Sequence, residues 1–185
     1  AIENITLSGS YSMPQQGIEA DMTLYVKQPS KMAMSMEIPN VGEMRNGFDG
    51  ETGWEMNPLT GFREISGTEL EQMEKQALLF PELELGKNYK SAERVADRKD
   101  GRIALKLITQ SDFEETWVFD PQTYYLSEMR VMIDAGIQGS FPVTIQMQDY
   151  RGVDGIMIPY KTVTSNPAFS VILNIESIAM TTEIP

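Results

Sequence analysis

The sequence predicts a mostly β protein: an incomplete antiparallel β-barrel, a half-barrel meander of about 11 strands, with one or two helices covering the concave face. Three observations predict it. Apolar and polar residues alternate with period two over most of the 185 residues, as in strands with one buried face. Turn signals separate these stretches about every 10–14 residues, and helical spacing of apolar residues occurs once. Because no repeat or linker interrupts the pattern, residues 1–185 are expected to form a single domain.

The strands before the helix show the alternation most clearly. In the third strand Met32, Met34 and Met36 share one face, and small or charged residues take the other. Pro29 ends the second strand, and Asp49-Gly50 marks a later turn. Strands are accordingly predicted at 5–13, 18–26, 31–38, 43–49, 52–57 and 62–65.

One helix is predicted next. Thr68 and Glu71 have the spacing of a capping box, which satisfies free amide groups at a helix start, and Pro81 ends the pattern. The apolar positions between them recur at near-helical spacing: Leu70, Met73, Ala77 and Phe80. Segment 66–88 is either a lid with hinges at Pro81 and Gly86 or a permanent plug of the sheet. After it the alternation predicts strands at 89–97, 101–109, 113–120, 124–134, 141–150, 155–164 and 169–180.

Composition excludes several classes of function. The net charge of −12 argues against a nucleic-acid partner, which a basic face would bind. The chain has no cysteine and no histidine, so it lacks disulfides, thiolate catalysis, a Ser-His-Asp triad and His or Cys metal sites. No apolar run reaches the ~18 residues of a transmembrane segment. The chain begins inside a strand-like pattern without a signal segment, as a trimmed, exported protein would.

Paired carboxylates are the one catalytic option left, since glycoside hydrolysis needs only two acids. The candidates are Asp49, Glu51, Asp120, Asp149 and Asp154. They lie beside Gly, Pro or Thr, as Asp does at hairpin corners where it accepts backbone hydrogen bonds. We therefore expect a protein that is not an enzyme and that has no cofactor and no metal.

Methionine is the unusual residue. The chain has 13, most of them on presumed inward strand faces, and methionine adapts to ligands of varied shape. A Met-rich core would give the same composition. A twisted sheet with one helix over its concave side is, however, expected to leave a lined apolar cavity. The candidate ligand-binding residues are Met22, Leu24, Met32, Met34, Met36, Met44, Trp54, Leu70 and Met73.

Two segments, Val26–Pro29 and Asp49–Pro58, resemble the LolA/LolB-like periplasmic lipoprotein carrier superfamily. Members show V-K-R-P and then D-G-x-T-x-W-x-x-N-P at similar spacing. The second pattern is matched by Asp49, Gly50, Thr52, Trp54, Asn57 and Pro58. Segments Phe119–Thr123 and Asp149–Pro159 are similar to parts of outer membrane lipoprotein-sorting protein-like chains.

The resemblance implies a half-barrel with helices over its mouth that holds acyl chains. The sequence departs from the family pattern in two places. Gln28 stands where carriers have an arginine that is used in loading and handing over lipoprotein. The helix that family members have before the first strand is not seen in this sequence. We expect a periplasmic or outer-membrane-associated protein that shelters a lipid, acyl chain or lipoprotein. The alternative is an envelope protein-interaction module that uses the open sheet or its edge, without a lipid ligand.

Overall fold

The structure is a computed structural model that describes residues 2–78, 85–95, 100–134 and 139–181. The described strands form one antiparallel sheet that does not close into a barrel, in the order β6-β5-β4-β3-β2-β1-β13-β12-β11-β10-β9-β8-β7. The strands are β1 (Asn4–Met13), β2 (Ile18–Lys27), β3 (Lys31–Ile38), β4 (Gly42–Phe48), β5 (Gly53–Asn57), β6 (Gly61–Ile65), β7 (Tyr89–Arg94), β8 (Ile103–Thr109), β9 (Glu114–Phe119), β10 (Leu126–Asp134), β11 (Ser140–Val153), β12 (Ile156–Ser165) and β13 (Ser170–Thr181).

The predicted fold class is confirmed, and the number of strands is corrected. The described sheet has 13 strands rather than about 11. Each of the thirteen segments predicted from the alternation forms one of these strands, including the two five-residue strands β5 and β6. A 3-10 turn, η1 (Pro14–Gln16), links β1 to β2. Asp154 and Gly155 both have positive φ at the turn from β11 to β12, as the tightest hairpins require.

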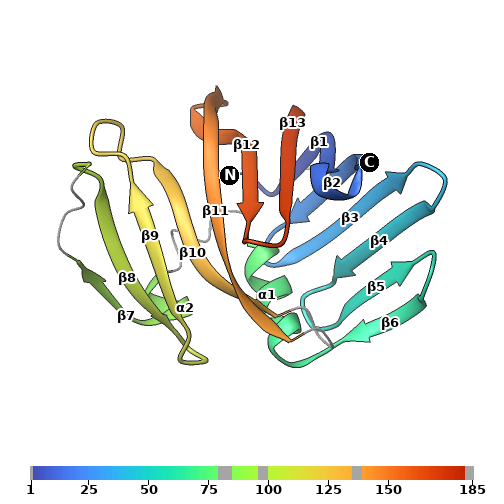
Figure 1. The fold of residues 1–185 in the computed structure, drawn as a ribbon, viewed down its shortest axis with the longest axis horizontal. Coiled ribbons are helices and arrows are strands. Elements are labelled where there is room, and N and C mark those ends of the chain that lie inside the picture. Colours follow the sequence, from blue (N-terminus) through green and yellow to red (C-terminus); the bar gives the residue numbers. More distant parts are fainter. Residues whose placement is uncertain (1, 79–84, 96–99, 135–138, 182–185) are drawn as a thin grey trace.

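The order of the strands explains where the helices lie. β1 pairs with β13, so the first and last strands lie side by side in the middle of the sheet. Each half of the chain then meanders outward, one to the edge strand β6 and the other to the edge strand β7. The segment between β6 and β7 must therefore join the two edges. It carries α1 (Gly67–Gln76) and the short α2 (Leu85–Asn88), and α1 lies within the curve of the sheet (Figure 1).

The start of α1 differs from the predicted capping box. The helix begins at Gly67, and the preceding Ser66 makes no side-chain capping hydrogen bond. Thr68 already lies inside the helix, because Gly67 enters it with a φ of +63° that favours glycine. The helix ends at Gln76, where the Ala77 amide donates to the Met73 carbonyl at 3.0 Å. The predicted stop at Pro81 and the apolar position Phe80 lie outside the described residues.

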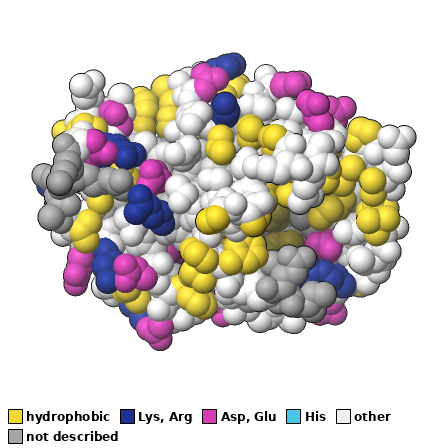
Figure 2. Space-filling view, viewed as in Figure 1, with side chains coloured by type: hydrophobic (Ala, Val, Ile, Leu, Met, Phe, Trp, Pro, Cys, Tyr) yellow, Lys and Arg dark blue, Asp and Glu magenta, His cyan; other side chains and the backbone are white. Residues whose placement is uncertain are grey.

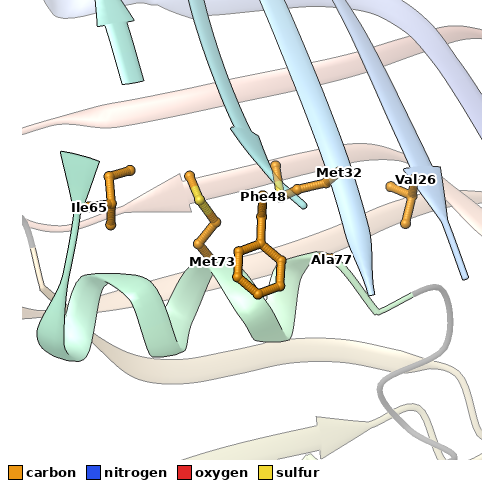
Figure 3. Packing of buried hydrophobic residues seen from close by; sticks show 6 residues of the cluster. All are labelled: Val26, Met32, Phe48, Ile65, Met73 and Ala77. Carbon is orange, nitrogen blue, oxygen red and sulfur yellow. The ribbon is translucent and has the colours of Figure 1, made fainter. Parts of the chain in front are cut away.

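The main core joins α1 to the first half of the sheet. Met73 of α1 and Ala77, which follows the helix, pack with buried side chains of β2 to β4 and β6 (Figure 3). Gly53 of β5 makes this approach possible, because a Cβ there would lie 2.8 Å from Leu70 Cδ1 and 3.0 Å from Met73 Sδ. The residues of this cluster are Val26, Met32, Phe48, Ile65, Met73 and Ala77, with Leu24, Met34 and Leu70 packed against it.

Candidate ligand pocket between α1 and the sheet

The other side of α1 faces β9 to β11 across an apolar pocket of about 270 Å³. On the side seen in Figure 2, apolar side chains gather near the hollowed middle and charged side chains lie mostly toward the margin. The polar side of α1 forms one wall of the pocket with Thr68, Glu71, Gln72, Lys75 and Gln76. The strands form the opposite wall, chiefly with Trp117, Leu126, Met129, Val131, Ile133, Ile145 and Met147.

Strand register produces this apolar wall. Trp117 pairs with Met129 across β9 and β10, and Met129 pairs with Ile145 across β10 and β11. Directly paired residues project from the same face of a sheet. Three neighbouring strands therefore present one continuous apolar row to the helix.

Glu115 organises the polar end of the pocket. Its Oε2 accepts hydrogen bonds from the Tyr89 hydroxyl at 2.6 Å and from Trp117 Nε1 at 3.1 Å. Lys75 Nζ of α1 lies 3.6 Å from its Oε1 and 5.4 Å from the centroid of the Tyr89 ring. Burial, and then the hydrogen bond to Glu115, raises the pKa of Tyr89 above its ordinary value. The hydroxyl therefore stays a hydrogen-bond donor at neutral pH.

The two sides of α1 are held by different kinds of contact. Leu70, Met73 and Ala77 make apolar contacts on the side of β3 to β6. On the pocket side the contacts are polar. Gln72 Nε2 donates to the Met132 carbonyl at 3.0 Å, Lys75 pairs with Glu115, and the Ser111 hydroxyl donates to Glu71. Polar contacts at a partly exposed surface contribute less free energy than the burial of apolar side chains, and water can replace them. The pocket side is thus the weaker attachment of the helix.

Most of the residues predicted from the sequence lie together in the first half of the sheet. Met32, Met73, Leu24, Met34 and Leu70 belong to the main core. Met22 and Met36 are buried in a second cluster with Ala20, against which Met34 and Met44 pack. None of these residues lines the pocket beside β9 to β11.

Trp54 lies on the opposite face of the sheet from α1. It pairs with Gly47, whereas Phe48 and Met32 project toward the helix. A Cβ at Gly47 would lie 2.8 Å from Cε2 and Cζ2 of Trp54, so the indole covers this glycine. Gln28 is exposed in the turn after β2, where its backbone N–H donates to the Glu3 carbonyl at 2.8 Å.

Sequence reasoning missed the polar end of the pocket. Tyr89, Glu115 and Trp117 come from β7 and β9, and the alternation does predict these strands. The available signal was that Glu115 and Trp117 alternate on one strand face, which places a carboxylate beside an indole. The pattern does not show that Lys75 of α1 is the ion-pair partner of Glu115.

Asp49 and Asp120 occupy hairpin corners, as predicted. Asp49 Oδ1 accepts from the amides of Glu51 and Thr52 at 2.9 and 2.8 Å, and these hydrogen bonds hold the pKa of Asp49 below its ordinary value. The amides of Thr123 and Gln122 lower the pKa of Asp120 in the same way. These carboxylates therefore have local structural partners.

In the described part of the chain, no group of three or more acidic side chains could hold a metal ion. The helices of that part lack the length and apolar character that a membrane-spanning helix needs.

An open antiparallel sheet with a helix against its concave face defines the class of fold to which this chain belongs. Solved structures share this fold. A putative outer membrane lipoprotein-sorting protein domain from Vibrio parahaemolyticus superposes with a TM-score of 0.65 at 13% identity, over 99% of this chain and 87% of that one. A LolA superfamily protein from Nitrosomonas europaea gives 0.65 at 10% identity, over 100% and 87%. A DUF1329 family protein from Desulfovibrio piger gives 0.66 at 9% identity, over 100% and 88%.

The chain therefore has the fold of the LolA superfamily, which confirms the resemblance carried by Val26–Pro29 and Asp49–Pro58. Neither a protein-family model nor a curated protein matches the sequence. At such low identity the likeness is one of fold, and function has to be argued from the site.

Proposed function

We propose that this protein is a non-catalytic carrier that shelters the apolar part of a lipid, acyl chain or lipoprotein in the pocket beside α1, in the periplasm or at the outer membrane. The observation that carries the proposal is the mismatch between the two walls of this pocket. The strands present apolar side chains, whereas α1 presents polar ones and is attached there only by polar contacts among the described residues. An acyl chain entering beneath the helix would complete the apolar wall.

The energetics favour such a ligand. Each buried methylene group contributes about 0.8 kcal/mol, so a chain of ordinary length binds without a charged contact. Ordering of the ligand and of the helix offsets part of this gain. The contacts displaced on entry are weak, since exposed ion pairs contribute about 0–1 kcal/mol.

The charged side chains at the polar end of the pocket determine which head group the ligand can have. It combines two carboxylates, Glu71 and Glu115, with one ammonium group, Lys75. This balance favours a neutral, zwitterionic or cationic head group over an anionic one, because like charges repel in a partly desolvated site. A phosphatidylethanolamine or a monoacylglycerol fits this chemistry better than a free fatty acid does.

The Met-rich face predicted from the sequence is a proposed extension of this site. Met34 and Met44 are only half-buried there. Asn46 of β4 pairs directly with Met34 of β3. Its side-chain Oδ1 is buried and has no hydrogen-bond partner among the described residues. An unpaired buried acceptor of this kind is costly and would be satisfied by a ligand hydroxyl or amide.

The test is native mass spectrometry of protein purified from a bacterial host and then incubated with monooleoylglycerol, phosphatidylethanolamine or oleate. We expect lipid adducts that are lost on denaturation, with oleate the weakest ligand. Met129→Gln keeps the size of the side chain but removes apolar surface from the pocket wall, and should weaken binding about threefold to tenfold. Met34→Gln tests the Met-rich face in the same assay.

Met157→Gln is the matched control, because Met157 is an exposed methionine on β12. Equal binding by all three variants would contradict the proposed sites. A mass free of adducts after every incubation would contradict the proposal as a whole.

One observation favours the alternative, a protein-interaction module of the bacterial envelope. The edge strand β6, the neighbouring strand β5 and the turn between them expose large apolar side chains, with Leu59 79%, Phe62 63% and Met56 41% accessible. Met56 and Phe62 are direct cross-strand partners. An exposed apolar strand at a free sheet edge is suited to pairing with an extended segment of another protein, and an adduct-free mass would favour this function.

A further inference from the structure

A second hollow, of about 420 Å³, lies on the convex face of the sheet, away from α1. Residues of β2 to β5 and of the turn after β4 line it. Met32 and Phe48, whose side chains pack toward α1, contribute to the lining. The other six residues are Tyr25, Lys27, Lys31, Ala33, Asp49 and Trp54. We refer to these six residues as the convex slot. It shares none of the six with the pocket beside α1.

The register of the strands gives the slot aromatic walls and a small floor. Tyr25, Ala33, Gly47 and Trp54 pair in one row across β2, β3, β4 and β5. The indole of Trp54 covers Gly47, and Ala33 is left exposed between this ring and Tyr25. Tyr25 on β2 and the indole over Gly47 on β4 lie two strand spacings apart, about 9.6 Å. This separation leaves room over Ala33 for one flat ring that contacts both aromatic side chains.

Two lysines stand at one end of the slot. Lys27 and Lys31 are directly opposite each other on β2 and β3, on the same face as Tyr25 and Ala33. Like charges in this position destabilise a strand pair. Among the described residues neither lysine has an ion-pair partner within 4.0 Å.

Asp49 also lines the slot and interacts electrostatically with Lys31, so one negative charge faces two positive ones and the slot keeps an excess of positive charge. The chain as a whole has a net charge of −12. Two lysines without an ion-pair partner among the described residues, beside two aromatic rings, therefore make a positively charged site on a negatively charged protein. An anionic group between the two ammonium groups would relieve their repulsion.

We propose that the convex slot binds a small planar aromatic anion. The ring lies over Ala33 between Tyr25 and Trp54, and the carboxylate or phosphate group lies between Lys27 and Lys31. The site needs both parts of the ligand, since the rings recognise the flat apolar body and the lysines recognise the charge. Its chemistry differs from that of the pocket beside α1, and the proposal does not depend on the lipid-carrier function.

The two tryptophans of the chain allow the sites to be monitored separately. Trp54 lines the convex slot and Trp117 lines the pocket beside α1. We would titrate isotope-labelled protein with 2-naphthoate and follow the two indole N–H signals by NMR at low salt. The Trp54 signal should shift to saturation with a Kd on the order of 1 mM, as expected for a ligand of this size, and the Trp117 signal should stay in place.

Ala33→Ile fills the floor of the slot with a residue that suits an exposed strand, and should weaken binding at least about tenfold. Ala92→Ile, at an exposed position of β7, is the matched control and should leave binding unchanged. Lys27→Met and Lys31→Met keep the apolar stems of the side chains, and each should weaken binding about threefold or more.

Three results would overturn the proposal. The first is a Trp54 signal that does not move up to about 10 mM 2-naphthoate. The second is an equal response to the neutral 2-naphthalenemethanol, which would remove the role of the lysines. The third is full binding by Ala33→Ile, which would place the ligand elsewhere.

Discussion

At the scale of single residues, two strand glycines decide what each face of the sheet accepts. Gly53 faces α1, and the helix side chains Leu70 and Met73 occupy the place of its missing side chain. Gly47 faces the other way, and the indole of Trp54 covers it. Both glycines have an ordinary strand conformation rather than a positive φ, so their importance lies in close approach rather than in backbone freedom.

Gly53→Ala should destabilise the protein by about 1–3 kcal/mol, the usual cost of overpacking, because the new Cβ must displace the helix. The measurement is chemical denaturation. Gly152→Ala is the matched control, since a Cβ there would meet only Met157 Sδ at 3.6 Å, an ordinary contact. That variant should stay within about 0.5 kcal/mol of the parent. Equal destabilisation of both variants would contradict the close packing of α1 on β5.

Tyr89 predicts a loss of stability in alkali. Burial raises its pKa in the folded protein, so above its ordinary pKa of 10.0 the unfolded state loses the phenolic proton while the folded state keeps it. The free energy of unfolding should therefore be constant with respect to this group below about pH 9 and fall as the pH rises further.

Tyr89→Phe should reduce this alkaline slope while lowering stability at neutral pH by about 1 kcal/mol, through loss of the hydrogen bond to Glu115. Urea unfolding between about pH 8 and pH 11 measures both effects. Tyr124→Phe is the control, because Tyr124 is 69% exposed. A slope unchanged by Tyr89→Phe would show that other groups, such as the half-buried Tyr11, account for it.

At the scale of elements, α1 combines a fixed side and an exchangeable side. Its spacing of apolar residues predicted the fixed side correctly, because Leu70, Met73 and Ala77 all pack on the sheet. The exchangeable side could not be predicted, since Glu71, Gln72 and Lys75 have the composition of a solvent-exposed face. Their partners, Ser111, Met132 and Glu115, follow about 40 to 60 residues later. The choice between lid and plug depends on this side.

Lys75→Met should loosen the pocket side of α1. The ion pair to Glu115 contributes about 0.2–1 kcal/mol, so amide hydrogen exchange over 72–76 should accelerate about twofold to fivefold. Exchange in β3, beneath the fixed side, should not change. Lys106→Met is the control, because it makes the same substitution at a Lys–Glu pair, with Glu114, that does not involve α1. The same acceleration in both variants would contradict a specific role of the Lys75–Glu115 pair in holding α1 against the sheet.

At the scale of the whole molecule, the pairing of β1 with β13 determines where function can lie. It places the chain ends in the middle of the sheet and sends the two meanders to opposite edges. The connection between the edges must then cross the concave face, which creates the pocket beneath α1. The same arrangement leaves β6 and β7 as free edges. β7 is largely polar and exposed, as protected edges are, whereas β6 carries the exposed Phe62.

The sequence by itself determined the strands, most of the turns, one face of the helix and the fold. These depend on local rules, namely period-two alternation and turn residues, and on the resemblance of motif positions such as Asp49, Trp54 and Pro58 to a known family. Tertiary structure alone decided which apolar face became a cavity. Met32 became buried because the fixed side of α1 packs on it, whereas Met22 and Met36 became buried in a separate cluster of strand side chains. Met129, Ile145 and Trp117 face the polar side chains of α1 across the pocket. The reason is that a helix of ten residues packs closely on one half of a 13-stranded sheet and leaves a gap over the other half.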